Sequence, residues 1–353
     1  MTRPGQYLSG VIEGFYGRPW SFQQRLAYAR FLRHGGLNTY IYCPKADPWL
    51  RKRWFDDWPA AEWQQLVALA GHYRDSGVNF GMGLSPFALY QQYGPGERAA
   101  LQAKVQRLLE LDIPLLAVLF DDMPGDLECL AERQAQIIND IHSWIDGRRL
   151  LVCPTYYSFD PVLETHFGAM PPDYWPRLGA ALPDDVDVFW TGNAVCSQQI
   201  SAEDVLPVNE LLGRPVLLWD NYPVNDGAVR SQYLYGEALS QRSPELAAIT
   251  TGHLCNPMNE ALLSLPALSG LSRLVGNGAI TGEWLGEVMG DSLWQQLQRD
   301  FPLFQSAGLA ALREDGRAAQ CEKIYAGLPG PAAVEVVQWL RGQYAFDPAC
   351  LTD

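Results

Sequence analysis

The chain has little positive charge. Its 353 residues include 26 Lys and Arg against 40 Asp and Glu, which gives a formal net charge of −14. Binding to phosphate backbones requires a concentrated basic surface, and the sequence shows none. An anionic membrane surface attracts the same basic residues. We therefore expect neither a nucleic acid nor a membrane as a partner.

Metal-binding and redox motifs are also lacking. The seven Cys are widely spaced without a C-x-x-C pair, and the five His are scattered without an H-E-x-x-H pattern. A zinc ribbon, a redox dithiol and a zinc protease site are therefore not expected, and we expect no cofactor. Buried, reduced thiols in a reducing compartment are the simpler interpretation.

Long apolar runs are missing as well. No stretch of about 18 apolar residues offers a transmembrane helix, and the residues after Met1 hold no apolar core of a signal peptide. We expect a cytoplasmic protein. Aromatic residues, in contrast, are abundant, with 12 Trp and 16 Tyr. Such side chains stack well on flat ligands such as sugar rings, although many belong to the core.

Strand and helix patterns alternate along most of the chain. Eight apolar runs predict strands at Leu8–Phe15, Leu37–Pro44, Val78–Leu84, Leu115–Phe120, Arg149–Tyr157, Val186–Gly192, Pro215–Asn221 and Ala247–Asn256. Helical spacing lies between them, for example in Ser21–His34 (with a capping-box pattern at Ser21–Gln24), Glu62–Asp75, Glu97–Leu111, Cys129–Trp144 and Ala202–Leu212. Eight strand–helix units predict an α/β fold, a closed (β/α)8 TIM barrel.

The strand signal stops at about residue 281. Beyond it, Leu293–Arg299, Leu309–Arg313 and Ala332–Leu340 have the pattern of amphipathic helices. We therefore predict a catalytic barrel over residues 5–280 and a small α-helical C-terminal region over residues 281–353. Within the barrel, the seventh crossover (residues 222–245) has the weakest helical pattern.

A pair of adjacent acids follows the fourth predicted strand. Leu115–Phe120 is apolar throughout, as in a strand buried on both faces, and Asp121 and Asp122 come directly after it. Desolvating two like charges side by side is costly unless a function requires them. Barrel enzymes display catalytic groups at the carboxyl ends of their strands. From position alone, the pair could serve glycoside chemistry, hold a metal or cap a helix.

Polar and aromatic residues also mark the ends of six other predicted strands. They are Glu13–Gly17, Pro44–Asp47, Pro154–Tyr157, Trp190–Gly192, Trp219–Asp226 and Asn256. Each alone has an ordinary explanation, such as a surface charge or a turn-forming residue. Together they predict one polar rim at the open face of the barrel.

These strand ends lie within seven sequence motifs. In chain order, the motifs are Gly10–Trp20, Leu37–Lys45, Leu119–Asp122, Cys153–Tyr157, Trp190–Gly192, Trp219–Asp226 and Asn256–Pro257. In residues and order they resemble glycoside hydrolase family 84, the O-GlcNAcase-like β-N-acetylglucosaminidases. The resemblance implies a (β/α)8 barrel, in agreement with the strand count. It also implies a retaining hydrolase that removes terminal GlcNAc from a β-linked glycoside or glycoprotein.

The resemblance further implies roles for individual residues. Asp121 would orient the 2-acetamido group, whose carbonyl oxygen attacks the anomeric carbon to form an oxazoline. Asp122 would protonate the leaving oxygen and then deprotonate the water that opens the oxazoline. The other implied substrate contacts are Tyr157 near the anomeric centre, Asn221 and Asn256 on acetamido and hydroxyl groups, Trp219 in the acetamido pocket wall, and Lys45, Asp226 and the Gly10 carbonyl on sugar hydroxyls.

This chemistry sets a geometric condition on the two acids. An oxocarbenium-like transition state needs an acid at the leaving group and negative charge near the developing cation. Consecutive strand residues, however, point to opposite faces. Both Asp therefore reach one pocket only if the chain leaves strand geometry, and Met123–Gly125 is a suitable place for such a break.

Two other interpretations stay open. A barrel hydrolase dependent on Mg²⁺ or Ca²⁺ could use Asp121, Asp122 and Asp226 as ligands, because hard cations prefer oxygen. A non-hydrolytic barrel could bind GlcNAc-bearing glycans or proteins without cutting them. The sequence identifies neither what carries the sugar, nor the oligomeric state, nor the role of the C-terminal region.

Overall fold

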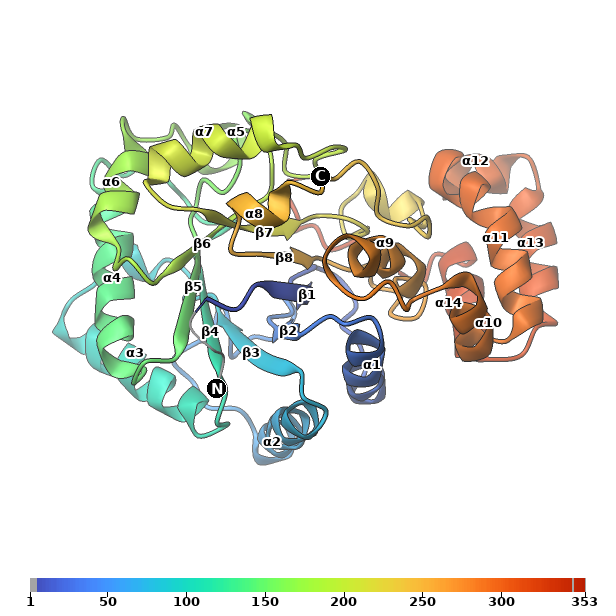
Figure 1. The fold of residues 1–353 in the computed structure, drawn as a ribbon, viewed down its shortest axis with the longest axis horizontal. Helices are drawn as coiled ribbons and strands as arrows, with labels where there is room; N and C mark the ends of the chain where they lie inside the picture. The colour runs from blue at the N-terminus through green and yellow to red at the C-terminus, as the bar shows by residue number, and fades with distance from the viewer. Residues whose placement is uncertain (1–4, 345, 353) are drawn as a thin grey trace.

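The structure, a computed structural model, describes residues 5–344 and 346–352. Eight parallel strands form a barrel in sequence order, and β8 pairs with β1 to close it (Figure 1). The strands are β1 Leu8–Glu13, β2 Thr39–Tyr42, β3 Asn79–Leu84, β4 Leu115–Leu119, β5 Arg149–Cys153, β6 Asp187–Trp190, β7 Val216–Asp220 and β8 Gly252–Cys255. The predicted (β/α)8 barrel is confirmed.

The predicted strands are longer than the observed ones, mostly at their carboxyl ends. The excess residues leave the ladder and form the rim of the barrel, as Tyr157 and Asn256 do. At the other end of the eighth strand the prediction is wrong, because residues 247–249 belong to the short helix α8 (Leu246–Ile249). A short apolar run has too few residues for its periodicity to separate a helix from a strand.

Strand β4 is buried along its whole length, and residues 115–120 are fully inaccessible to solvent. One face of the strand points into the barrel and the other packs under the helical layer, so both faces favour apolar residues. The strand pairs in parallel with β3 and with β5. The carboxyl ends of the parallel strands lie at one rim, which places Asp121 and Asp122 among the residues that follow the other strands.

Helices cover the outside of the barrel (Figure 1). The predicted capping box at the first helix is present, since Ser21 and Gln24 exchange side-chain and backbone hydrogen bonds. The crossover helices are α1 Phe22–His34, α2 Ala60–Asp75, α3 Pro95–Leu109, α4 Leu130–Trp144, α5 Val162–Phe167, α6 Tyr174–Ala181, α7 Ala202–Leu212, α8 and α9 Leu265–Val275, with 3-10 turns η1 Leu89–Gln91 and η2 Arg230–Gln232. The seventh crossover holds just η2 and α8 along its described residues, in line with its weak helical pattern.

The C-terminal region is helical and lies to one side of the barrel (Figure 1). Its helices are α10 Gly282–Met289, α11 Asp291–Ser306, α12 Leu309–Glu314, α13 Arg317–Ala326 and α14 Pro331–Leu340. The sequence pattern predicted α11, α12 and α14 but missed α10 and α13. The division into residues 5–280 and 281–353 stays a prediction, and residues 345 and 353 lie outside the described residues.

Helix α14 is attached to the barrel through a buried acid. Glu335 accepts hydrogen bonds from the backbone N–H groups of Leu262 and Leu263 and from the side chain of Gln24. Burial raises the pKa of Glu335 to about 8, so this contact does not need a charged carboxylate near neutral pH.

The structure also bears on disulfide bonds and on membrane-spanning helices. Within the described residues no disulfide joins the seven cysteines, and the thiols of Cys43, Cys153 and Cys255 are buried. Among the described helices, none has the length and apolar character needed to cross a bilayer.

Candidate active site

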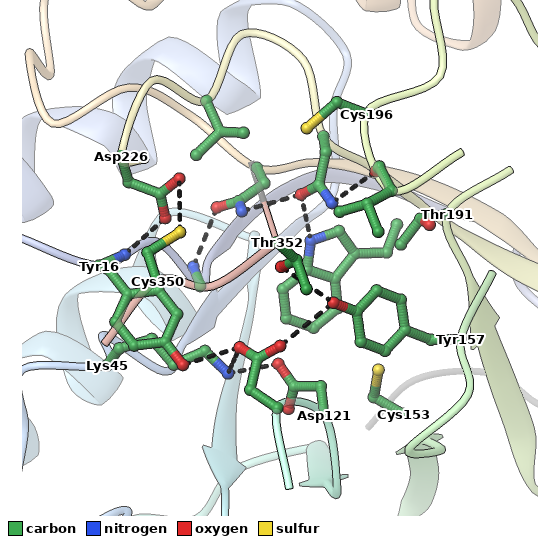
Figure 2. Close-up of a pocket in the computed structure, with 17 residues that line it drawn as sticks. Tyr16, Lys45, Asp121, Cys153, Tyr157, Thr191, Cys196, Asp226, Cys350 and Thr352 are labelled. Carbon is green, nitrogen blue, oxygen red and sulfur yellow. Dashed lines mark hydrogen bonds and ion pairs between the residues drawn. The ribbon is translucent and has the colours of Figure 1, made fainter. Parts of the chain in front are cut away.

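A pocket lies where the carboxyl ends of the strands meet (Figure 2). Side chains from the ends of β1, β2 and β4–β8 line it. Eight of the nine predicted site residues are among them, namely Lys45, Asp121, Asp122, Tyr157, Trp219, Asn221, Asp226 and Asn256. The structure therefore brings together residues that are up to 211 positions apart in the chain, since Lys45 and Asn256 line one pocket.

The backbone at Asp122 meets the geometric condition on the acid pair. Asp122 has a φ of 57°, in the left-handed region, so the chain leaves strand geometry at the second acid itself. Both carboxylates consequently enter the pocket instead of pointing to opposite faces. The predicted break at Met123–Gly125 is one residue too late. Asp tolerates left-handed backbone better than most residues because its short side chain hydrogen-bonds locally.

Asp121 has one bound oxygen and one unbound oxygen. Its Oδ2 forms a close ion pair with the ammonium group of Lys45. Its Oδ1 is buried and has no hydrogen-bond partner among the described residues. Burial alone would lower the pKa of Lys45, but the neighbouring Asp121 raises it above its ordinary value. A buried acceptor without a donor is costly, so Oδ1 is a suitable acceptor for a donor on a ligand.

Asp122 accepts a hydrogen bond on each oxygen. The Tyr16 hydroxyl donates to Oδ2 at 2.7 Å, and the Tyr157 hydroxyl donates to Oδ1 at 3.1 Å (Figure 2). Burial raises the pKa of both tyrosines, and the charge of Asp122 raises it further. The two phenols therefore stay protonated and hold this carboxylate from both sides.

Arg51 supports this arrangement from below the pocket. Its guanidinium donates to the backbone carbonyl of Asp122 at 3.2 Å and to Ser85 Oγ at 3.0 Å. It also lies 5.9 Å from the centre of the Tyr16 ring. Strand β3 thus contributes to the site through Ser85, which follows it. The Arg51 side chain fixes both the turn at Asp122 and one of the tyrosines that bind its carboxylate.

An amide network forms another wall. Asn221 Oδ1 accepts hydrogen bonds from the Trp219 indole and from the Asn256 side chain, both at 3.0 Å. Asn221 Nδ2 donates to the Val195 carbonyl at 2.8 Å, and the Gly14 backbone N–H donates to Asn256 Oδ1 at 3.2 Å. Each polar atom of the network has a partner that fixes its direction, so the indole face and amide groups are pre-positioned for a ligand.

Asp226 is a buried acid on the opposite side of the pocket from Asp121 (Figure 2). The backbone N–H of Tyr16 donates to its Oδ2 at 2.7 Å. Burial raises the pKa of Asp226 to about 6. Above that pH Asp226 therefore offers ligand hydroxyls acceptors alone, and in more acidic solution one of its oxygens carries a proton and donates.

The structure does not bring Gly10 to the pocket. Gly10 lies inside β1, pairs with Thr39 of β2 and Leu254 of β8, and is absent from the lining. Gly14, which follows the strand, stands there instead. A strand that pairs on both sides uses its carbonyls in the ladder, so the residue just past the ladder is the one whose backbone faces the pocket.

The acid at the end of β1 is structural. Glu13 is fully buried, and both its oxygens accept from Arg25, at 2.6 Å and 2.8 Å. Tyr40 also donates to it. With its oxygens bound in this way, Glu13 is not a candidate catalytic group.

The cation positions do not favour a metal ion in the pocket. The Lys45 ammonium lies beside Asp121 and 4.0 Å from Asp122, where it would repel a divalent cation. Elsewhere in the described residues, Asp220, His253 and Cys255 lie within ligand distance of one another. There Arg242 donates twice to Asp220, at 2.7 Å and 2.8 Å, and takes the place of a cation.

Sequence reasoning missed several residues of the site. Gly14 and Tyr16 lie within the motif Gly10–Trp20, but the resemblance implies no role for them. Thr191, Cys350 and Thr352 also line the pocket, and Arg51 lies behind it. Of these, Cys350 and Thr352 had no sequence signal, because they follow the last helix and reach the barrel only through the fold.

Comparison with known proteins bears on this pocket directly. A family model of β-N-acetylglucosaminidases matches residues 9–281, which contain the eight strands except Leu8 and all eight predicted residues that line the pocket. The chain belongs to the β-N-acetylglucosaminidase family. This confirms the family indicated by the strand-end motifs.

Two mammalian proteins are among the relatives of this chain. The chain is 31% identical over 266 residues to Protein O-GlcNAcase of Rattus norvegicus, and 31% identical over 262 residues to that of Mus musculus. Each alignment covers 71% of this chain and 28% of the relative. The chain therefore spans less than a third of the length of these relatives.

A solved structure covers more of the chain. A mutant of the Thermobaculum terrenum O-GlcNAc hydrolase is similar with a TM-score of 0.78 and 28% sequence identity. The similarity covers 96% of this chain and 81% of that one. The C-terminal helices are thus largely included in the structural similarity, beyond the region that the family model matches.

Proposed function

We propose that the protein is a retaining β-N-acetylglucosaminidase that removes terminal GlcNAc with the help of the substrate's own acetamido group. The observation that carries this proposal is the unpartnered Oδ1 of Asp121, a buried acceptor 7% exposed as a side chain and held in place by Lys45. An acetamido N–H would satisfy it. The carbonyl oxygen of the same acetamido group would then face the anomeric carbon and form the oxazoline.

Lys45 serves this step by placing its positive charge beside Asp121 Oδ2, which holds the carboxylate in position. A carboxylate that accepts from the amide N–H polarises the amide and makes its carbonyl oxygen a better nucleophile. Negative charge at this place also stabilises the positive charge that develops on the sugar ring in the transition state. Because the substrate provides the nucleophile, the enzyme needs no second carboxylate at nucleophilic distance.

Asp122 is the proposed general acid and base. Protonated, it would give its proton to the leaving oxygen; as a carboxylate, it would take a proton from the water that opens the oxazoline. The hydroxyls of Tyr16 and Tyr157 can follow either state, since a phenol both donates and accepts. They support the ionised form as arranged here.

The rest of the pocket would bind the sugar. Asp226 and the Gly14 backbone face ligand hydroxyls, Trp219 packs against the acetamido methyl group, and Asn221 and Asn256 orient the polar edge of the ring. The names of the relatives, Protein O-GlcNAcase and O-GlcNAc hydrolase, support a glycoprotein with O-linked GlcNAc as substrate. We further propose a cytoplasmic location.

Hydrolysis of 4-nitrophenyl β-N-acetylglucosaminide tests the proposal. Asp121→Asn and Asp122→Asn should each lower kcat/KM by roughly 100-fold or more, as for loss of a catalytic acid or base. Asp57→Asn is a matched control, because Asp57 is 74% exposed and is not among the residues that line the pocket. Absence of hydrolysis of any β-N-acetylglucosaminide between mildly acidic and mildly basic pH would rule the proposal out.

Leaving-group dependence separates the two acids. With a better leaving group, formation of the oxazoline needs less protonation. Asp122→Asn should therefore lose less of the oxazoline-forming rate on a substrate with a good leaving group than on one with a poor leaving group. Asp121→Asn should lose the same share of this rate on both substrates. A metal-dependent hydrolase would treat both carboxylates alike and would lose activity with a chelator. Calorimetric GlcNAc binding without turnover would instead favour the non-hydrolytic barrel.

A further inference from the structure

A segment after the last helix runs back to the pocket of the barrel. Helix α14 ends at Leu340, and Tyr344 is buried, with Arg18 lying 5.2 Å from its ring centre. Beyond it, Asp347 and Cys350 close a turn, in which the Cys350 N–H donates to the Asp347 carbonyl at 2.9 Å. The turn directs the residues that follow it toward the strand ends.

Two side chains of this segment enter the pocket from the same side. The Cys350 thiol lies 3.9 Å from Asp226 Oδ1, and the Thr352 hydroxyl lies 3.3 Å from the Tyr157 hydroxyl (Figure 2). Thr352 is 9% exposed, whereas Leu351 between them is 47% exposed. This alternation is that of an extended backbone with one face in the pocket.

The segment leaves too little space for a sugar. The free volume of the pocket is about 40 Å³, which is room for one to about three water molecules and not for a hexose ring with an acetamido group. The side chains of Asp121, Asp122 and Lys45 are correspondingly 7%, 9% and 3% exposed. The catalytic carboxylates of the proposed reaction are therefore covered.

We propose that the pocket is a binding site for this peptide segment, residues 346–352, which competes with the sugar for Asp226 and for the space beside Tyr157. The competition with sugar rests on the proposed function, while binding of the segment does not. The segment must leave before substrate enters.

The contacts suit a reversible occupant. The segment has neither helix nor strand along its described residues, and its exposed side chains Phe346 and Leu351 leave it half in solvent. Local opening of such a terminal segment costs less free energy than global unfolding. If the pocket is open in one molecule out of ten, the apparent affinity for substrate is lowered roughly tenfold.

Charge substitution in the full chain is the first test. Cys350→Glu places a carboxylate beside Asp226 and should expel the segment, whereas Leu351→Glu makes the same charge change on the exposed face and is the control. We expect KM for 4-nitrophenyl β-N-acetylglucosaminide to fall at least threefold in Cys350→Glu, with kcat unchanged, and neither to change in Leu351→Glu. An unchanged or higher KM in Cys350→Glu would overturn the proposal.

A shortened chain and a synthetic peptide give the second test. Removal of residues 345–353 should lower KM in the same way, and the peptide of residues 346–353 should then inhibit competitively. A fall in kcat in a shortened chain that still unfolds cooperatively would mean that the segment completes the site, which contradicts the proposal. Calorimetry of the peptide with the shortened chain needs no turnover, so absence of hydrolysis with peptide binding would refute the proposed function alone.

Discussion

The Lys45–Asp121 ion pair allows a quantitative prediction on stability. The two side chains are 3% and 7% exposed, and Lys45 has a second acid, Asp122, 4.0 Å away. In Asp121→Asn a buried ammonium group loses its main partner. Removing one member of a buried pair costs about 3–5 kcal/mol because the other charge is left uncompensated. We expect about 3 kcal/mol, the lower end, because Asp122 still attracts Lys45 and Asn retains an acceptor oxygen.

The double variant should recover much of this loss. Lys45→Met with Asp121→Asn removes the buried positive charge and one of the two adjacent negative charges, and a neutral replacement of a buried pair is often close to neutral in stability. Lys45→Met alone leaves Asp121 beside Asp122, where repulsion destabilises the site. The two single losses should therefore exceed the loss in the double variant by about 2 kcal/mol or more.

Urea unfolding followed by tryptophan fluorescence at neutral pH would measure the four free energies. The surface pair Arg177–Glu132, with side chains 38% and 47% exposed, is the control and should show a coupling below about 1 kcal/mol. Additivity within about 0.5 kcal/mol at Lys45 and Asp121 would refute this coupling, and with it the inference that Lys45 holds Asp121 in position.

Three further variants test other parts of the site. Burial raises the pKa of Asp226 to about 6, so this acid binds more protons in the folded chain than in the unfolded one. The free energy of unfolding should therefore fall by up to ~3 kcal/mol as pH rises from about 4 to 6. Asp226→Asn should lose that slope in urea unfolding at several pH values; an identical slope in both proteins would contradict the assignment. Gly14→Ala places a Cβ 2.3 Å from the Trp219 ring, and steady-state kinetics should show KM raised about tenfold, whereas an unchanged KM would mean that the indole does not bind substrate. Arg51→Met removes the hydrogen bond to the Asp122 carbonyl. It should lower kcat by roughly 10- to 100-fold, the equivalent of a lost charged hydrogen bond, with little change in KM. Arg51→Lys should recover part of kcat, whereas a change in thermal stability alone would argue against a positioning role.

Much of the fold was predictable because the information is local. Each strand of the barrel is a short apolar run bounded by polar residues, and burial on both faces makes such runs visible in the sequence. The rim followed from the rule that carboxyl ends of parallel strands meet. Eight of the nine predicted residues therefore line one pocket, whereas Gly10 lies within the β1 ladder. The residue that leaves this ladder, Gly14, cannot be told from its neighbours by pattern.

The parts of the fold and of the site that the sequence did not predict depend on long-range packing. Arginine is usually a surface residue, so the sequence gives no sign that Arg51 is buried beside Asp122. The position of Cys350 and Thr352 results from the path of the chain after α14. Helices α10 and α13 were missed because most of the stability of a helix in a protein comes from tertiary packing and not from its own sequence.

The left-handed backbone at Asp122 restricts which amino acid can stand there. Glycine would relieve the conformational cost, which is of order 1–2 kcal/mol for most residues, but it has no acid to offer. Glutamate is an equally good acid in solution, yet it lacks the short side chain that makes this conformation tolerable and would carry its carboxyl group past Tyr16 and Tyr157. The backbone and the proposed chemistry therefore make opposite demands at this one position, where Asp122→Gly would remove the conformational cost together with the acid and the hydrogen bonds it accepts from Tyr16 and Tyr157.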